Sequence, residues 1–406
     1  MRQLIRDQWK LLLFGFLMTF WSAPGQTFFV SLFSGQIRAD LHLGHAEFGG
    51  LYSLATLISA LVILWSGSML DKVDLRLFSQ IVALGLLTGC VALASSTTAI
   101  SLLVAFFLLR QFGQGLMIMT ASTSMVRYLN ANKGSANALS GMGYRFSESL
   151  LPAVIVAVLA FFSWREILFG TAALTLLILC PAIFVLLGGH GKRHQAYHLD
   201  LSQKELSSSG QKQWLRSEVL KDKLFYLILP ATSSGAFLFT GFIFHQVALV
   251  ESKGWSLQAW GSWFIAYGMV SAIAAIVCGR LIDRYSARAL TAFMPLPIAA
   301  ALLSLATADS SWSAGLFLGL MAITTGMIAT ASGPLYAELY GTQYLGSIKS
   351  ATSAAMVLAS AVSPVAIGWL LDQSVSFETV ALASACYAIF AAGIAAVALR
   401  QPAPNS

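Results

Sequence analysis

Long apolar runs separated by short polar breaks dominate the chain. A membrane-spanning helix needs about 20 apolar residues. Two runs, 99–126 and 135–161, are apolar but carry internal charges, and the other runs of that size are uncharged. The pattern predicts an all-α membrane protein with twelve transmembrane helices, the ten uncharged ones being 11–37, 48–70, 77–94, 167–189, 224–250, 254–279, 289–308, 310–337, 350–371 and 379–399.

Composition agrees with a membrane protein. The chain is 57% hydrophobic and 10% charged, whereas soluble domains are about 25% charged. The first apolar run lasts from Lys10 to Arg38, which is too long for the apolar region of a signal peptide, so we interpret it as the first span. All four cysteines lie inside apolar runs and read as free thiols rather than metal ligands.

The basic residues set the expected orientation. With the N-terminus inside, cytoplasmic segments hold 19 of the 24 Lys and Arg, and outer loops hold three. This bias places both termini in the cytoplasm of a bacterial-type inner membrane. The net charge of +7 is therefore a topology signal that contacts anionic lipid, and we do not expect a nucleic-acid partner.

The longest polar break lies at 189–222 and separates six helices from six. We expect an N-terminal half at 1–188, a cytoplasmic linker at 189–222 and a C-terminal half at 223–406. His190, His194 and His198 recur every four residues there, but the glycines and polar residues around them indicate a solvated linker more than a metal site. The end of this segment, 213–223, could form an interfacial helix.

The two halves match at a constant offset of 212 residues. Gly67-x-Met69-x-Asp71-Lys72 with Arg76 becomes Gly279-x-Leu281-x-Asp283-Arg284 with Arg288. Pro152 becomes Pro364, and Gly49 becomes Gly261. One offset for features so far apart indicates a duplicated six-helix unit, with halves related by pseudo-two-fold symmetry and the substrate between them.

The duplicated Gly-x-Leu-x-Asp-Arg pattern resembles the signature of the major facilitator superfamily, over essentially the whole chain. The resemblance implies a secondary transporter that works by alternating access. Tyr128-Leu129, Lys133-Gly134-x-Ala136 and Gly141 resemble the corresponding segment of monocarboxylate porters, and Arg110 with Gly113-Gln114-Gly115 resembles a motif widespread in the superfamily.

Several departures from the usual motifs help to assign the chain to a branch of the superfamily. The first signature has Asp74 where glycine is usual, and the arginine-rich extension of sugar porters is absent. The acidic first-helix motif of drug–proton antiporters is absent too. Monocarboxylate porters usually carry an arginine in the eighth helix, and 256–279 has none. The segment from Tyr128 to Gly141 favours the monocarboxylate branch, but the missing arginine leaves the identity of the substrate open.

Three charges are clearly internal to spans: Arg110, Arg145 and Glu148. Such charges usually face a cavity or a partner, and all three lie near the midplane. Gln114 shares a face with Arg110, while Tyr144 and Arg145 lie one turn before Glu148. The second half has Ala322, Val357 and Ser360 at the equivalent positions, which favours a special role for the first half.

Two arginines against one carboxylate favour an anionic substrate, because the guanidinium fork matches a carboxylate. Glu148 is then the candidate proton carrier. The alternative is an Arg110–Glu148–Arg145 ion network that only ties two helices together. Further candidates for the substrate and proton site, each with a packing role as its alternative, are Trp21, Gln26, His245 and Gln246.

The signature residues lie at the cytoplasmic ends of their helices, too far from the midplane to touch substrate. By resemblance they form an inner latch that gates the cavity, and the alternative is that they only orient the chain. The gating set is Gly67, Asp71, Lys72, Arg76, Gly279, Asp283, Arg284 and Arg288.

The leading function is proton-coupled movement of a small organic anion such as a monocarboxylate. One alternative is proton-driven efflux of drugs or amphipathic metabolites, and another is a non-transporting receptor or assembly partner. We find no nucleophile–base arrangement and no phosphate loop, so we expect neither an enzyme nor a cofactor. The expected partners are the small-molecule substrate, the coupling proton and the lipid bilayer, around a monomer.

Overall fold

The computed structural model describes residues 2–66, 69–70, 73–129, 133–189, 214–341 and 345–400. It divides into two compact units, Met1–His42 with Leu54–Ser209, and Leu43–Ser53 with Gly210–Ser406. The predicted boundaries of the two halves stay a prediction. Most of the predicted linker, including the three histidines, lies outside the described residues.

The first unit begins with a helix that is broken near its middle. α1 (Arg2–Trp21) gives way to η1 (Ala23–Gly25), α2 (Thr27–Val30), η2 (Ser31–Phe33) and α3 (Ser34–Leu41). Pro24 cannot donate a helical hydrogen bond, and Gln26 is extended at φ −92° and ψ 150°. The remaining elements are α4 (His45–Ser66), α5 (Leu75–Ala94), α6 (Ala99–Leu108), η4 (Leu109–Met117), α7 (Ile118–Tyr128), α8 (Lys133–Val158), α9 (Trp164–Leu174), η6 (Thr175–Leu179) and α10 (Cys180–Leu186).

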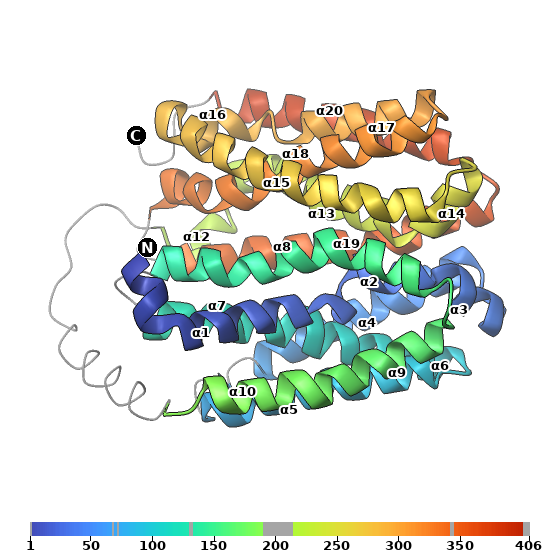
Figure 1. Cartoon of the computed structure of the whole chain (residues 1–406). Helices are drawn as coiled ribbons and strands as arrows, with labels where there is room; N and C mark the ends of the chain where they lie inside the picture. Colours follow the sequence, from blue (N-terminus) through green and yellow to red (C-terminus); the bar gives the residue numbers. More distant parts are fainter. Residues whose placement is uncertain are drawn as a thin grey trace, which may run out of the picture. The chain divides into compact units, whose positions relative to one another are not determined.

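The second unit also takes in the first part of α4. A short α12 (Arg216–Val219) precedes α13 (Lys223–Phe244) and α14 (Gln246–Ser252), so the expected helix at 213–223 is only one turn long in the described residues. The unit continues with α15 (Leu257–Tyr285), α16 (Ala287–Thr291), α17 (Pro295–Thr307), α18 (Ser311–Tyr340), α19 (Leu345–Asp372) and α20 (Phe377–Ala398) (Figure 1).

The prediction of an all-α fold with twelve spans is confirmed. Within the described residues, 10 helical stretches are long and apolar enough to cross a membrane. Two further segments bring the number of spans to twelve: the broken helix 2–41, and α8, which carries Arg145 and Glu148.

Small residues allow the helices to approach closely, as is usual between membrane helices. In the first unit α1 lies against α8, as Figure 1 shows, and a Cβ at Gly143 would meet the main-chain carbonyl oxygen of Phe16. In the second unit α15 packs on α18, where a Cβ at Gly326 would meet the carbonyl oxygen of Ser271. The contact with α1 fixes the position of α8, which carries Arg145 and Glu148.

Candidate functional site

Arg110 is buried, with 2% of its surface exposed. Its Nε donates to Oγ1 of Thr56 on α4 at 3.0 Å, and one terminal nitrogen donates to the carbonyl oxygen of Gly25 at 3.1 Å. Gly25 lies in the break of the first helix, whose carbonyls lack regular helical partners. Arg110 therefore closes the break between α1 and α2 and anchors it to α4.

The segment around Arg110 is a π-helix of nine residues, Leu109–Met117. Such segments are rare and often occur at functional sites. Gly25 and Gly113 permit the contact with η1, since a Cβ at Gly113 would lie 2.8 Å from Cα of Gly25. The two main chains thus touch where both depart from α-helical geometry. Interrupted helices that line a cavity are common in transporters.

Gln111 is a buried polar residue that the sequence reasoning missed. Its side-chain oxygen accepts from Ser59 at 3.1 Å, and its nitrogen donates to Ser66 at 2.8 Å. Ser59 and Ser66 are seven residues apart on α4, a polar stripe that could have signalled this partner. Gln114, which was predicted to share a face with Arg110, is only partly buried.

Glu148, Arg145 and Tyr144 form a cluster on α8, as predicted from their spacing. The Tyr144 hydroxyl donates to Glu148 Oε1 at 3.1 Å, and Arg145 lies 3.5 Å from Oε2. The Glu148 side chain is 2% exposed and that of Arg145 is 29% exposed. Oε2 accepts no hydrogen bond from the described residues, so the ion pair is its main compensation.

The predicted charges have different hydrogen-bond and ion-pair partners. Arg110 donates to Thr56 and Gly25, whereas Glu148 accepts from Tyr144 and pairs with Arg145. The first unit therefore holds two polar centres, one at the helix break and one on α8.

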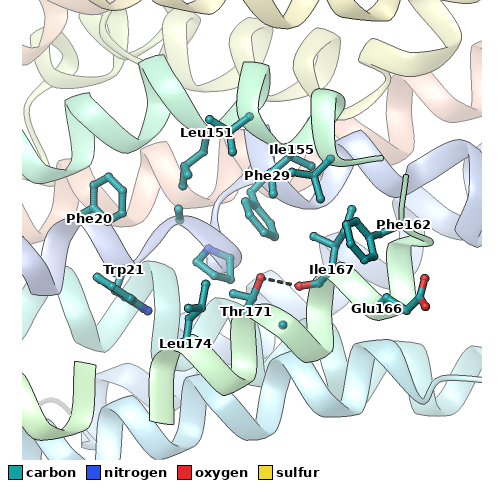
Figure 2. A pocket seen from close by; sticks show the side chains of 15 residues that line it. Phe20, Trp21, Phe29, Leu151, Ile155, Phe162, Glu166, Ile167, Thr171 and Leu174 are labelled. Carbon is teal, nitrogen blue, oxygen red and sulfur yellow. Dashed lines mark hydrogen bonds between the residues drawn. The ribbon is translucent and has the colours of Figure 1, made fainter. Parts of the chain in front are cut away.

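The candidate residues of the first helix lie on either side of its break. Gln26 is buried, and its side-chain nitrogen lies 3.4 Å from the Ser22 hydroxyl. Trp21 lines an apolar cavity of about 410 Å³ between the first helix, α8 and α9 (Figure 2). Trp21 thus faces apolar side chains within the first unit.

His245 and Gln246 lie at the junction of α13 and α14, and both are buried. Nε2 of His245 is 2.8 Å from the carbonyl oxygen of Pro364, and Gln246 accepts a hydrogen bond from Nε1 of Trp260 at 2.6 Å. Trp260 is fully buried, so it packs in the core of the second unit. These contacts give His245 and Gln246 a packing role in the second unit.

The described signature residues fall into two groups. Arg76 donates to the carbonyl oxygen of Phe184 near the end of α10, and Arg288 donates to that of Leu399 after α20, at 2.9 and 2.7 Å. Each arginine thus stabilises the negative end of the last helix of its repeat. Asp283 and Arg284 are exposed, and Gly279 faces Thr330. Gly67, Asp71 and Lys72 lie outside the described residues.

Within the described part of the chain, no group of three His, Cys, Asp or Glu side chains could hold a metal ion. The four cysteines are free, and Cys90 and Cys278 are buried.

Comparisons with solved structures show the fold. The nucleoside transporter NupG aligns with a TM-score of 0.74 and 13% identity, covering 97% of this chain and 100% of that one. A bacterial homologue of the human lysosomal transporter Spinster, in an inward-facing and unoccupied conformation, aligns with a TM-score of 0.68 and 15% identity, covering 96% of each chain. At identities this low, the similarity shows a common fold and nothing about the substrate. The comparison with curated proteins finds no match.

The sequence itself shows the family. Residues 11–347 and 239–406 match the Major Facilitator Superfamily. The overlapping matches cover the chain from the first span to its last residue, and they agree with the duplicated signature and the twelve spans. The chain belongs to the Major Facilitator Superfamily and is a multi-pass membrane transporter rather than an enzyme.

Proposed function

We propose that this transporter couples the movement of a small organic anion, such as a monocarboxylate, to that of a proton. The observation that supports this most is the α8 cluster, in which the buried Glu148 carboxylate lies 3.5 Å from the more exposed Arg145 guanidinium. An acid and a cation that depend on each other can exchange partners during a transport cycle.

Arg145 is the proposed anion-binding residue. Its side chain is 29% exposed, so a substrate carboxylate can reach the guanidinium without displacing the helix. The planar fork of arginine offers two parallel hydrogen bonds to a carboxylate. A substrate anion bound there would compete with Glu148 for the same positive charge.

Glu148 is the proposed proton carrier. A buried carboxylate that loses its cation is strongly destabilised, and taking up a proton removes that cost. Tyr144, 3.1 Å from Glu148 Oε1, can donate a hydrogen bond to the charged carboxylate or accept one from the protonated acid. Anion binding at Arg145 and proton binding at Glu148 would then favour each other.

Arg110 has a different proposed role. Its bonds to Gly25 and Thr56 join the broken first helix to α4, so it holds the joint about which the first helix bends during alternating access. Gln26, Gln114, His245 and Gln246 stay candidates for the substrate path, and the signature residues stay candidates for its inner gate. The distribution of basic residues supports a bacterial-type cytoplasmic membrane with both termini inside.

The test is uptake of labelled small carboxylates into proteoliposomes under an inward proton gradient. We expect accumulation with the parent protein and none with Arg145→Gln or Glu148→Gln. Glu251→Gln, which changes an exposed carboxylate at the end of α14, is the matched control and should transport normally. If folded parent protein moves uncharged or cationic compounds and no carboxylate, the anion proposal fails and efflux of amphipathic compounds takes its place.

A further inference from the structure

An apolar cavity in the first unit is lined by residues other than those of the α8 cluster. Its volume is about 410 Å³. The walls come from the broken middle of the first span, from α8 and from α9. Figure 2 shows Trp21 and Leu174 towards one end and Glu166 with Phe162 towards the other. The rim residues Val154, Phe162 and Leu174 are 41%, 54% and 51% exposed. Because the exposed apolar side chains of this rim lie on or next to membrane-spanning helices, the cavity opens towards the hydrocarbon of the bilayer.

The length of the cavity suits a lipid chain. Glu166 and Leu174 are eight residues apart on helical segments, or about 12 Å at 1.5 Å per residue. One leaflet contributes about 15 Å to the hydrocarbon core. The apolar lining therefore extends through most of one leaflet, starting at the end where α9 leaves the membrane.

Glu166 supplies a negative charge at the membrane surface end. Its Oε2 accepts bonds from the nitrogen and hydroxyl of Ser163, both at 2.8 Å, and the residue is exposed. The adjacent cation is already engaged, because Arg165 binds Asp40 and the carbonyl oxygens of Ala94 and Ser96. The carboxylate is thus open to a cation from outside the protein.

In the second half of the repeat, the equivalent carboxylate has a cationic partner. Glu378 lies 212 positions after Glu166 and pairs with Lys253 at 2.7 Å. The position equivalent to Lys253 in the first half is Leu41. The second half also has Leu382 where the cavity has Gly170, at which a Cβ would meet no atom within 4 Å. At these equivalent positions the first half has open space and a carboxylate without the lysine that the second half supplies.

We propose that this cavity binds a membrane phospholipid whose headgroup carries an ammonium group, with one acyl chain along α8 and α9 and the ammonium on Glu166. In the predicted orientation the lipid belongs to the outer leaflet. The occupant comes from the bilayer because the rim opens into it. Charge complementarity selects zwitterionic lipids with an ammonium over purely anionic ones.

The test is photo-crosslinking in nanodiscs that contain phosphatidylethanolamine and phosphatidylglycerol, with a photoreactive acyl chain on one lipid at a time. We expect crosslinks in the peptides spanning 151–174, stronger for the ethanolamine lipid. Gly170→Leu, which fills the cavity with the residue found in the other repeat, should reduce them severalfold. Gly393→Leu, at an open position on α20, is the control and should leave them unchanged.

Glu166→Gln separates charge from space, because glutamine can still accept the Ser163 bonds and keep the helix cap. We expect it to abolish the preference between the two lipids while crosslinking persists. Thermal unfolding confirms that each variant is folded. Equal crosslinking in Gly170→Leu and parent, or crosslinks spread evenly over other exposed helices, would overturn the proposal, as would displacement of the lipid by a transported amphipathic cation.

Discussion

Arg110 donates a hydrogen bond at 3.1 Å to the main-chain carbonyl oxygen of Gly25, 85 residues earlier in the chain. A second bond joins Arg110 to Thr56. The guanidinium thus supplies a hydrogen bond to a carbonyl oxygen in the Pro24 break of the first helix and joins that break to α4. A motif arginine that sequence alone suggested as a substrate ligand has a structural task in this arrangement.

Arg110→Ala should lower stability, because the buried Gly25 carbonyl loses its partner. Leaving one such group unsatisfied costs about 1–3 kcal/mol. The measurement is the thermal unfolding midpoint in detergent, beside Arg6→Ala, which removes an arginine whose side chain is 90% exposed. Equal midpoints for the two variants would show that Arg110 does not hold the break.

Arg145→Gln should destabilise the protein, since Glu148 is left buried without its cation. Breaking a buried pair on one side costs about 3–5 kcal/mol, and replacing both partners costs much less. Adding Glu148→Gln to Arg145→Gln should therefore restore most of the lost stability. Additive losses in the double-mutant cycle would mean that the pair is not energetically coupled.

Gly143→Ala and Gly141→Ala form a matched pair on one helix. A Cβ at Gly143 would meet the carbonyl oxygen of Phe16 on α1, whereas one at Gly141 meets nothing within 4 Å. Overpacking costs about 1–3 kcal/mol, while alanine in an open helical position gains about 1 kcal/mol over glycine. We expect opposite shifts of the unfolding midpoint. Shifts of the same sign would contradict the close packing of α1 on α8.

The ends of the second-unit helices provide a pH-dependent contact. Lys253 lies 2.5 Å from Asp309 and 2.7 Å from Glu378, with its side chain 1% exposed. Burial alone would lower the pKa of Lys253, but its hydrogen bonds to the two carboxylates outweigh burial and raise that pKa above the ordinary 10.5.

A raised pKa in the folded state means that this stabilisation is fully present below pH 10.5 and is lost as the pH rises through the folded value. Lys253→Met should therefore unfold at a lower temperature than the parent at neutral pH. The difference between the unfolding temperatures of the parent and the variant should become smaller above pH 10.5. If this temperature difference stays constant above pH 10.5, the charge of Lys253 contributes nothing to the stability of the folded state.

Local features were the most predictable part of this protein. The runs 224–250 and 310–337 correspond to α13–α14 and α18 within a few residues, because apolar length is set by the bilayer. The contacts of Glu148 with Tyr144 and Arg145 followed from spacing along one helix. Such contacts depend only on helical geometry.

Contacts between helices were not predictable in the same way. The partners of Arg110 depend on how the broken first helix and α4 are rotated towards α6 and α7, which no periodicity in one segment specifies. The π-helix at Leu109–Met117 arises where the main chain of Gly113 meets that of Gly25. The burial of Gln111 against Ser59 and Ser66 depends on the same packing.

The central claim is that Glu148 couples the anion to a proton, and one measurement separates coupling from binding. Labelled carboxylate and internal pH are followed together in proteoliposomes, for net uptake under a proton gradient and for exchange without one. We predict that the parent accumulates carboxylate with internal acidification, and that Glu148→Gln exchanges carboxylate but neither accumulates it nor acidifies the interior. Accumulation and acidification at parental levels in Glu148→Gln would contradict the account.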